Sequence, residues 1–233
     1  MKHNMRSILV DWIVEVCEEF KMATPTLFLI VELVDRALSK FEVARSRLQL
    51  LGCACILLAS KHEEIYPPTV DDLVHISDNT YKRGDIIEME LRVMRELDFR
   101  LHCITPCFFL ERFCRAAKSN RRERSLARYL LELLLQDYHM LEYPPSLKAA
   151  AAVNLACQTL RSSAQTAWTA QARYYTGYAA QELEECVRRL HALHLGAEAH
   201  SLRAVRDKYT RSGNHRVSEV TCLLADWLCF DGR

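Results

Sequence analysis

LQLLGCACILLASKHEE, residues 48–64, is the stretch that decides the fold of this chain. Between Leu50 and Ala59 it contains no polar side chain, so every direction around a helix would be apolar. A helix that is hydrophobic on all sides is a buried helix. Its apolar run would rise only about 15 Å, roughly half of what a membrane span requires. We therefore expect a short central helix that is surrounded by other helices.

The end of this helix combines charge with an abrupt stop. Residues 61–64, Lys-His-Glu-Glu, follow the apolar run directly, and Pro67-Pro68 prevents the helix from continuing. Glutamates in a last turn lie unfavourably at the negative end of the helix dipole, by a few tenths to about 1 kcal/mol. Charges placed against a local preference indicate a functional site, whereas the simpler interpretation is a solvated helix end. The residues alone leave both interpretations open.

Composition favours an all-α protein of a reducing compartment. Half of the 233 residues are hydrophobic, which suits one large domain or two of about 100 residues each. The net charge is +1 and Arg121–Arg124 is interpreted as a solvated inter-helix turn, so nucleic-acid binding through a basic face is disfavoured. The ten cysteines include no Cys-x-x-Cys pair, and most lie in apolar runs as free thiols do. Glycines are few, and no signal peptide or membrane span is visible.

Apolar periodicity predicts a tandem repeat of two five-helix domains. In the first half we expect helices at 5–20, 24–41, 48–64 and 82–97, and a short helix that begins at Thr69. In the second half we expect helices near 106–118, 123–142, 146–161, 169–176 and 180–195, with a further helix at 198–209. The third helices of both halves are rich in small residues and align at an offset of about 100, and the fifth helices align at about 96.

Local signals mark the starts of two of these helices. Thr24 and Pro25 are predicted as the N-cap and first helical residue of the second helix. Thr69 and Asp72 have the spacing of a capping box.

The first helix has an apolar arc of about 240°, counted at 100° per residue, whereas one core contact needs a stripe of only about 100°. One facet contains Met5, Ile8, Trp12 and Val16, and the other contains Val10, Ile13, Val14 and Cys17. We expect one facet to face the core and the other to line a groove.

Arg6 falls inside this apolar arc, where a buried guanidinium requires a carboxylate partner. Asp35, at the edge of the apolar face of the second helix, is the natural candidate. We predict a structural ion pair between Arg6 and Asp35.

Motifs of catalysis are missing. The chain has neither a G-x-G-x-x-G motif nor a P-loop, and His62-Glu63-Glu64 is not H-E-x-x-H. His191 and His194, three residues apart, could hold a metal, but no third ligand is evident and a pair of partly exposed helix histidines is the preferred interpretation. We expect no metal and no cofactor.

Long ordered motifs resemble the cyclin box of mitotic cyclins. In the first half these are MRSILVDWIVEV (5–16), RLQLLGCACILLASKHEEIYPP (47–68), ISDNTY (76–81) and MELRVMRELDFRL (89–101). ITPCFFLERFCRAA (104–117), YLLELLLQDYHMLEYPPSLKAAAA (129–152), YTGY (175–178) and LRAVRDKY (202–209) resemble the C-terminal cyclin fold. The resemblance covers roughly residues 4–218, and ISDNTY favours the B type over the A type.

The resemblance implies an N-terminal cyclin box at 1–102, a C-terminal cyclin fold at 103–218 and an unassigned tail at 219–233. The apolar residues of that tail could pack as a helix; they are Val220, Leu223, Leu224, Trp227 and Leu228.

The resemblance also implies a regulatory subunit, without catalysis of its own, that binds and activates a cyclin-dependent Ser/Thr kinase at G2/M and helps recruit substrates. The implied partners are the kinase and R-x-L substrates or inhibitors, with no nucleic acid and no membrane, in nucleus and cytoplasm. Kinase binding is assigned to Lys61, His62, Glu63, Glu64, Glu90 and Phe99. The groove that docks R-x-L peptides is assigned to Met5, Ile8, Leu9, Trp12, Glu15, Val16, Leu48 and Gln49.

Several positions depart from the family pattern. His62 occupies a position that is usually Phe or Tyr, which weakens that contact, and Ala179-Ala180 stands where acidic residues are common. Only four residues precede Met5, so we expect the family's N-terminal helix and destruction-box region to be missing. The alternative function is a TFIIB-like or transcriptional cyclin-fold adaptor acting at nucleic acid. The near-zero net charge and the presence of Lys61 and Glu90 favour the kinase partner.

Overall fold

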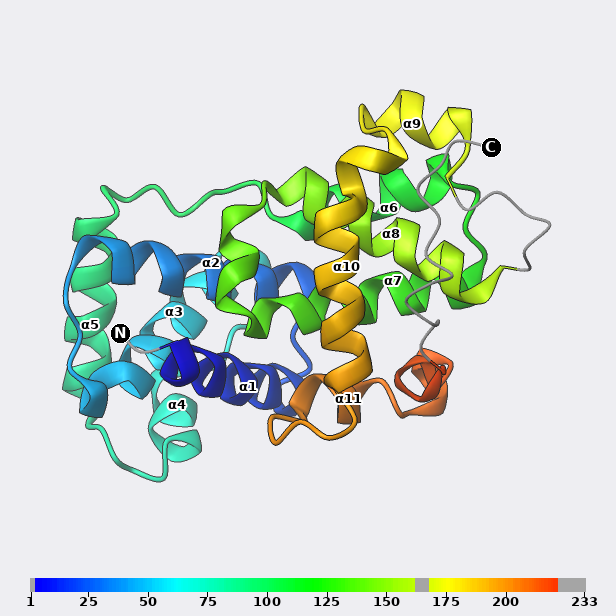
Figure 1. The fold of residues 1–233 in the computed structure, drawn as a ribbon. Coiled ribbons are helices and arrows are strands. Elements are labelled where there is room, and N and C mark those ends of the chain that lie inside the picture. Colours follow the sequence, from blue (N-terminus) through cyan, green and yellow to red (C-terminus); the bar gives the residue numbers. More distant parts are fainter. Residues whose placement is uncertain (1–2, 162–167, 222–233) are drawn as a thin grey trace. The chain divides into compact units, whose positions relative to one another are not determined.

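Helices joined by loops and turns make up residues 3–161 and 168–221, which are the residues described by this computed structural model (Figure 1). Within those ranges there is no strand, which confirms the all-α prediction. No helix there is long and apolar enough to cross a membrane. The fold divides into two compact units, Met1–Thr105 and Pro106–Arg233, and each is described separately below.

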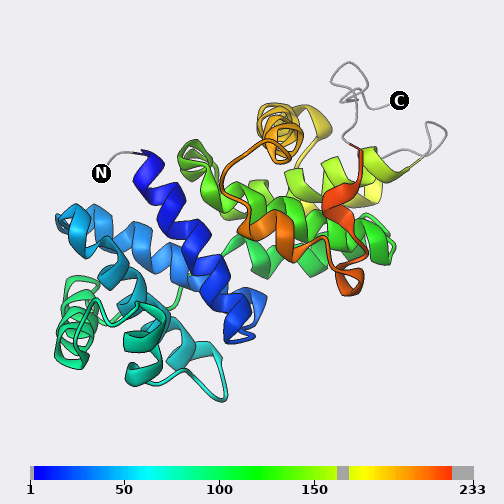
Figure 2. The same ribbon diagram turned by 90° about the horizontal axis from the view of Figure 1, so that it is seen from below.

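The first unit is organised around α3 (Leu48–Glu63), as its apolar sequence predicts. Helices α1 (His3–Glu19), α2 (Thr24–Lys40) and α5 (Arg83–Glu96) pack against α3, and α4 (Val70–Ile76) packs on α5 (Figure 2). Every residue from 50 to 60 is buried. Each large apolar side chain of this run contributes roughly 1.5–3 kcal/mol through removal from water. The 3-10 turn η1 (Arg45–Arg47) leads the chain into α3.

The start of α2 differs from the prediction. Ala23 is its N-cap and Thr24 its first residue, and no side chain within the helix caps it. Instead, the Glu64 carboxylate accepts hydrogen bonds from the Ala23 backbone N–H (2.7 Å) and the Thr26 hydroxyl. A carboxylate from the end of α3 therefore replaces the predicted Thr24 cap, and its charge is favourable at the positive end of the α2 dipole. The predicted capping box of Thr69 and Asp72 is confirmed at the start of α4.

The ion pair predicted inside the first unit is present and joins α1 to α2. Arg6 Nε lies 2.6 Å from Asp35 Oδ1, and Arg6 Nη2 lies 2.7 Å from Asp35 Oδ2. The Arg6 side chain is only 2% exposed. This two-point geometry is the strong form of an arginine–carboxylate contact.

The second unit repeats the arrangement around α8 (Pro145–Leu160). Helices α6 (Pro106–Ala116), α7 (Arg121–Leu133) and α10 (Ala180–Gly196) pack against α8, while α9 (Ala170–Thr176) packs on α6 and α11 (Ala204–Lys208) on α7. Residues 149–158 of α8 are buried throughout. Both central helices present small residues on several sides, so their neighbours can approach closely. The matching arrangement of helices around α3 and α8 confirms the predicted tandem repeat.

Two predicted helices of the second unit are shorter than expected. The helix predicted at 123–142 ends at Leu133 and continues as the 3-10 turns η2 (Leu134–Gln136) and η3 (Tyr138–Glu142). Between them the Asp137 side chain accepts a hydrogen bond from the His139 N–H, a local contact that competes with α-helix. The helix predicted at 198–209 is reduced to α11, because His200 Nδ1 accepts from the Leu202 N–H before it.

After α11, the described residues of the second unit contain the 3-10 turns η4 (Ser212–Asn214) and η5 (Val217–Glu219). Most of the predicted tail helix, residues 222–233, lies outside the described residues.

The interpretation of Arg121–Arg124 as a solvated turn is wrong. Residue 121 begins α7, and Glu123 is buried, where it forms an ion pair with Arg161 at 3.1 Å. Glu123 also closes a capping box with Asn120. Periodicity could not predict the Glu123–Arg161 pair, because its members are 38 residues apart along the chain.

His191 and His194 are also placed differently from the prediction. Both lie inside the second unit, with only 5% and 6% of their surface exposed, rather than partly exposed on a helix. The Tyr129 ring packs edge-on against His194 at 5.7 Å. Burial lowers the pKa of His194 to about 4, with smaller contributions from His191 and Arg206. Within residues 3–161 and 168–221, no group of three or more His, Cys, Asp or Glu side chains is placed to hold a metal.

Candidate functional site

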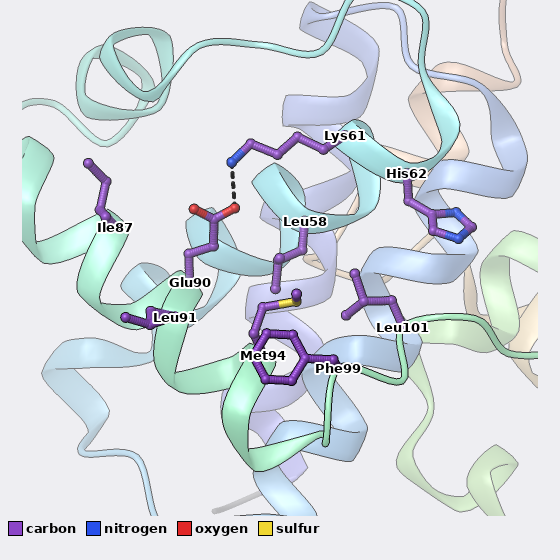
Figure 3. Close-up of a pocket in the computed structure, with 9 residues that line it drawn as sticks. All are labelled: Leu58, Lys61, His62, Ile87, Glu90, Leu91, Met94, Phe99 and Leu101. Carbon is purple, nitrogen blue, oxygen red and sulfur yellow. Dashed lines mark hydrogen bonds and ion pairs between the residues drawn. The ribbon is translucent and has the colours of Figure 1, made fainter.

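Residues of α3 and α5 line an apolar pocket in the first unit that is open to solvent (Figure 3). Its volume is about 520 Å³. The side chains that line it are Leu58, Lys61, His62, Ile87, Glu90, Leu91, Met94, Phe99 and Leu101. Four of the residues that the resemblance assigns to kinase binding therefore lie in one pocket: Lys61, His62, Glu90 and Phe99.

The floor and walls of this pocket expose large apolar side chains to solvent. Ile87 and Leu91 are each 42% exposed and Phe99 is 62% exposed. On α5, residues 87, 91 and 94 recur at helical spacing on one face, whereas Ile86, Met89 and Val93 of the opposite face are buried in the core. A contiguous exposed apolar patch of this kind indicates a docking surface.

Phe99 reaches the pocket through an unusual backbone. Asp98 and Phe99 follow the end of α5 with φ angles of +52° and +59°. The left-handed region is unfavourable for residues with a β-carbon, by roughly 1–2 kcal/mol each. The Phe99 N–H nevertheless donates to the Met94 carbonyl at 2.8 Å, which closes the end of α5 and turns the chain back over it.

A pair of opposite charges stands at the rim of the pocket. Lys61 Nζ, from the end of α3, lies 2.6 Å from Glu90 Oε1 of α5 (Figure 3). The Lys61 side chain is 50% exposed and that of Glu90 16%. The ammonium group retains further N–H donors, and the carboxylate retains acceptor capacity. Both groups can therefore bind the backbone of a partner while they hold each other in place.

The other predicted kinase-binding residues are distributed around this rim. His62 lines the pocket, where its Nδ1 lies 3.0 Å from Glu63 Oε1 and its ring centroid lies 6.3 Å from that of His102. Glu63 is exposed beside it, outside the pocket lining. Glu64 is committed to the start of α2, as described above.

The sequence did not identify five of the lining residues as part of a site. These are Leu58, Ile87, Leu91, Met94 and Leu101. A signal was present in α5, where apolar residues occupy two faces although one face suffices for the core.

The residues predicted to form the peptide groove lie on α1 and at the start of α3. Trp12 packs over Gly52, so closely that a β-carbon at Gly52 would lie 3.0 Å from the indole Cζ3 and 3.1 Å from Leu9 Cδ1. Ile8 is 51% exposed, Glu15 is exposed, and Met5, Trp12 and Gln49 are half-buried.

Three residues assigned to the groove are instead buried in the core. Leu9, Val16 and Leu48 are 6%, 2% and 7% exposed. The first helix therefore turns only part of its wide apolar arc toward solvent.

Comparison with known protein families accounts for both units. Residues 1–102 match the family described as "Cyclin, N-terminal domain", and residues 104–223 match "Cyclin, C-terminal domain". The chain belongs to the cyclin family. Cyclin-A1-3 of Oryza sativa subsp. japonica is 42% identical over 224 residues, which cover 94% of this chain and 45% of that protein. Cyclin-B2-2 of Arabidopsis thaliana is 44% identical over 209 residues, which cover 90% of this chain and 48% of that protein.

The chain spans about half the length of the curated relatives that it matches. A-type and B-type cyclins match at nearly the same identity, so these matches do not support the preference for the B type drawn from ISDNTY. Among solved structures, a viral cyclin from herpesvirus saimiri superimposes with a TM-score of 0.74 at 22% identity, over 83% of this chain and 85% of that chain. That match shows a shared fold.

Proposed function

We propose that this chain is a regulatory subunit that binds and activates a cyclin-dependent Ser/Thr kinase in cell-cycle control at G2/M, and that it has no catalytic activity of its own. The observation that carries this proposal is the exposed apolar pocket with Lys61 and Glu90 at its rim. Membership of the cyclin family supports it. The TFIIB-like or transcriptional adaptor is not favoured, since both halves match cyclin domains.

The geometry suits the docking of an amphipathic helix. Ile87, Leu91 and Phe99 offer an apolar surface to the kinase's C helix, and removal of that surface from water favours the complex. Lys61 donates to backbone carbonyls and Glu90 accepts from backbone N–H groups of the kinase segment that precedes this helix. Docking then holds the C helix inward, so that its glutamate pairs with the lysine that positions ATP.

The double substitution Lys61→Ala/Glu90→Ala tests this contact. We expect the double variant to lose activation of a cyclin-dependent kinase, measured as phosphorylation of a peptide substrate. Its melting temperature should change little, because a partly exposed ion pair contributes only about 0–1 kcal/mol. Full activation by the double variant would contradict the assignment.

The matched control is Asp71→Ala/Arg83→Ala. This pair also joins two helices of the first unit, at 2.8 Å, is well exposed, and lies outside the pocket lining. It removes one charge of each sign, as the test variant does, and we expect it to activate the kinase normally.

We further propose that the accessible residues between α1 and α3 bind R-x-L peptides of substrates and inhibitors. Trp12 and Ile8 offer an apolar surface for the leucine, and Glu15 offers a carboxylate for the arginine. Aromatic side chains at the centre of such contacts often contribute about 2 kcal/mol or more. Trp12→Ala should weaken an R-x-L peptide at least tenfold in a fluorescence titration and leave kinase binding intact. Ile87→Ala, in the pocket, serves as the reciprocal control; equal peptide affinity in the Trp12 variant would remove the groove from this proposal.

We also propose that the protein acts in the nucleus and the cytoplasm. In support, the cysteines of the described residues are all free thiols, as expected in a reducing compartment. Microscopy of a fluorescent fusion through the cell cycle tests this; confinement to an oxidising organelle would contradict it.

A further inference from the structure

The second unit carries five cations that the proposed kinase contact does not use. They lie at the end of α6, in the connecting turn and in the first turn of α7, and are Arg112, Arg115, Lys118, Arg121 and Arg122. Residues 112–122 contain no acidic side chain, although the whole chain has a net charge of only +1. All five side chains are exposed, and none of them forms a hydrogen bond or ion pair with the described part of the chain. We call this cluster the basic corner.

The nearest carboxylates do not neutralise the basic corner. Glu111 is engaged by Arg124 at 3.4 Å and by Arg128 at 3.7 Å. Glu123 is buried, where it binds Arg161 and the backbone N–H of Asn120. The acidic groups on either side are thus committed to other partners, and the positive charge of the corner faces solvent.

The backbone of the corner is held from inside. Arg161 Nη2 donates to the Ala117 carbonyl at 2.8 Å, and the Ser119 N–H donates to the Cys114 carbonyl at 2.8 Å. Lys118, in the turn between them, has a φ of +53°. Each cation is at most three residues from the next one along the chain, so the Cα atoms of neighbouring cations are no more than about 11 Å apart. A partner therefore meets closely spaced charges on a preorganised frame, which lowers the entropic cost of binding.

Two of the cations are placed against local electrostatics. Arg121 and Arg122 occupy the first turn of α7, at the positive end of the helix dipole, where cations are unfavourable. An anionic partner at this position would relieve both the dipole and the mutual repulsion of the five charges. Because no side chain of the described residues offsets this unfavourable placement of positive charge, we regard the corner as a binding surface.

We propose that the basic corner docks an acidic segment of a partner polypeptide, rich in aspartate and glutamate and carrying a bulky apolar residue. Phe108, which is 73% exposed, lies at helical spacing from Arg112 and Arg115 on α6, so the positive charge adjoins an apolar contact. The corner covers one helix–turn–helix connection rather than a long stripe, and a sequence pI near 7.6 gives little long-range attraction to a polyanion. These two features favour a short acidic peptide over nucleic acid.

Fluorescence anisotropy with the whole chain tests this proposal. The probe is a fluorescein-labelled peptide of aspartates and glutamates with one central phenylalanine, titrated at low and high salt. We expect saturable binding at low salt that weakens as salt screens the charges. Arg115→Gln/Arg121→Gln/Arg122→Gln should weaken binding at least tenfold, and the corresponding three Arg→Lys substitutions should retain most of it.

The matched control is Arg45→Gln/Arg47→Gln/Arg95→Gln, which removes three exposed arginines of the first unit and changes the net charge equally. It should bind the peptide within about twofold of the unchanged chain, and no variant should have a lower melting temperature than the unchanged chain. Equal weakening by test and control variants, or no binding of the peptide at low salt, would overturn the proposal. A single-stranded oligodeoxynucleotide or a phosphatidylserine vesicle that binds the corner more tightly than the peptide would overturn the assigned partner class.

Discussion

Asp35→Asn isolates the contribution of the buried ion pair between α1 and α2. In the native protein, Asp35 accepts two short hydrogen bonds, of 2.6 and 2.7 Å, from the guanidinium of Arg6. The substitution keeps the size of the side chain but removes its charge and turns one acceptor into an N–H₂ donor. That donor then faces a guanidinium nitrogen, and the Arg6 charge remains buried without its counter-ion.

The magnitude follows from burial. Removal of one partner of a buried pair costs about 3–5 kcal/mol. Because the Asp35 side chain is 16% exposed and Arg6 only 2%, water can reach the Asp35 side of the pair, and we expect the lower end of that range, about 3 kcal/mol. For a chain of this size each kcal/mol lowers the melting temperature by roughly 2–4 °C, so we expect a decrease of about 6–12 °C.

Chemical denaturation followed by circular dichroism, with a thermal scan in parallel, measures this loss. Asp71→Asn is the matched control, because Asp71 also pairs with an arginine at 2.8 Å but is 74% exposed. The control should change stability by no more than about 0.5 kcal/mol. If Asp35→Asn and Asp71→Asn cost the same stability within error, burial would not be what makes the Arg6–Asp35 pair important.

Two further predictions concern packing and pH. Gly52→Ala places a β-carbon 3.0 Å from the Trp12 ring and 3.1 Å from Leu9. Overpacking of this kind lowers the free energy of unfolding by about 1–3 kcal/mol. The higher helix propensity of alanine returns only up to about 1 kcal/mol. We expect a net loss of stability together with weaker R-x-L peptide binding, and a more stable variant with unchanged peptide affinity would contradict this. Since burial lowers the pKa of His194 from its usual 6.5 to about 4, the unfolded chain binds the proton first, and stability should be lost as pH falls from about 6.5 to 4. His194→Gln should flatten the dependence of the free energy of unfolding on pH across that window; an unchanged slope would show that other groups cause it.

The sequence determined the helical class, the two central helices and one of the buried ion pairs. An all-apolar run from Leu50 to Ala59 can be stable only if it is surrounded, whatever its neighbours are. Arg6 within an apolar arc requires a carboxylate, and Asp35 stood at the edge of the facing helix. These inferences depend on local periodicity and on the high cost of an unpaired buried charge, and both are properties of the chain itself.

Only the tertiary structure decided which apolar residues form the core and which form the site. Ile86 and Ile87 are adjacent and identical in chemistry, yet Ile86 is buried against the core and Ile87 lines the pocket. The sequence likewise could not place His191 and His194, which are buried because neighbouring elements cover them.

Three contacts between distant residues show the same limit. Glu64 caps α2, Glu123 pairs with Arg161, and the left-handed turn at Asp98-Phe99 brings Phe99 beside α3 residues of the pocket. Each depends on where other helices lie when the chain is folded, which a periodic pattern does not specify. Side chains of equal hydrophobicity therefore become core or docking surface according to the helix that covers them, and this is a property of packing rather than of local sequence.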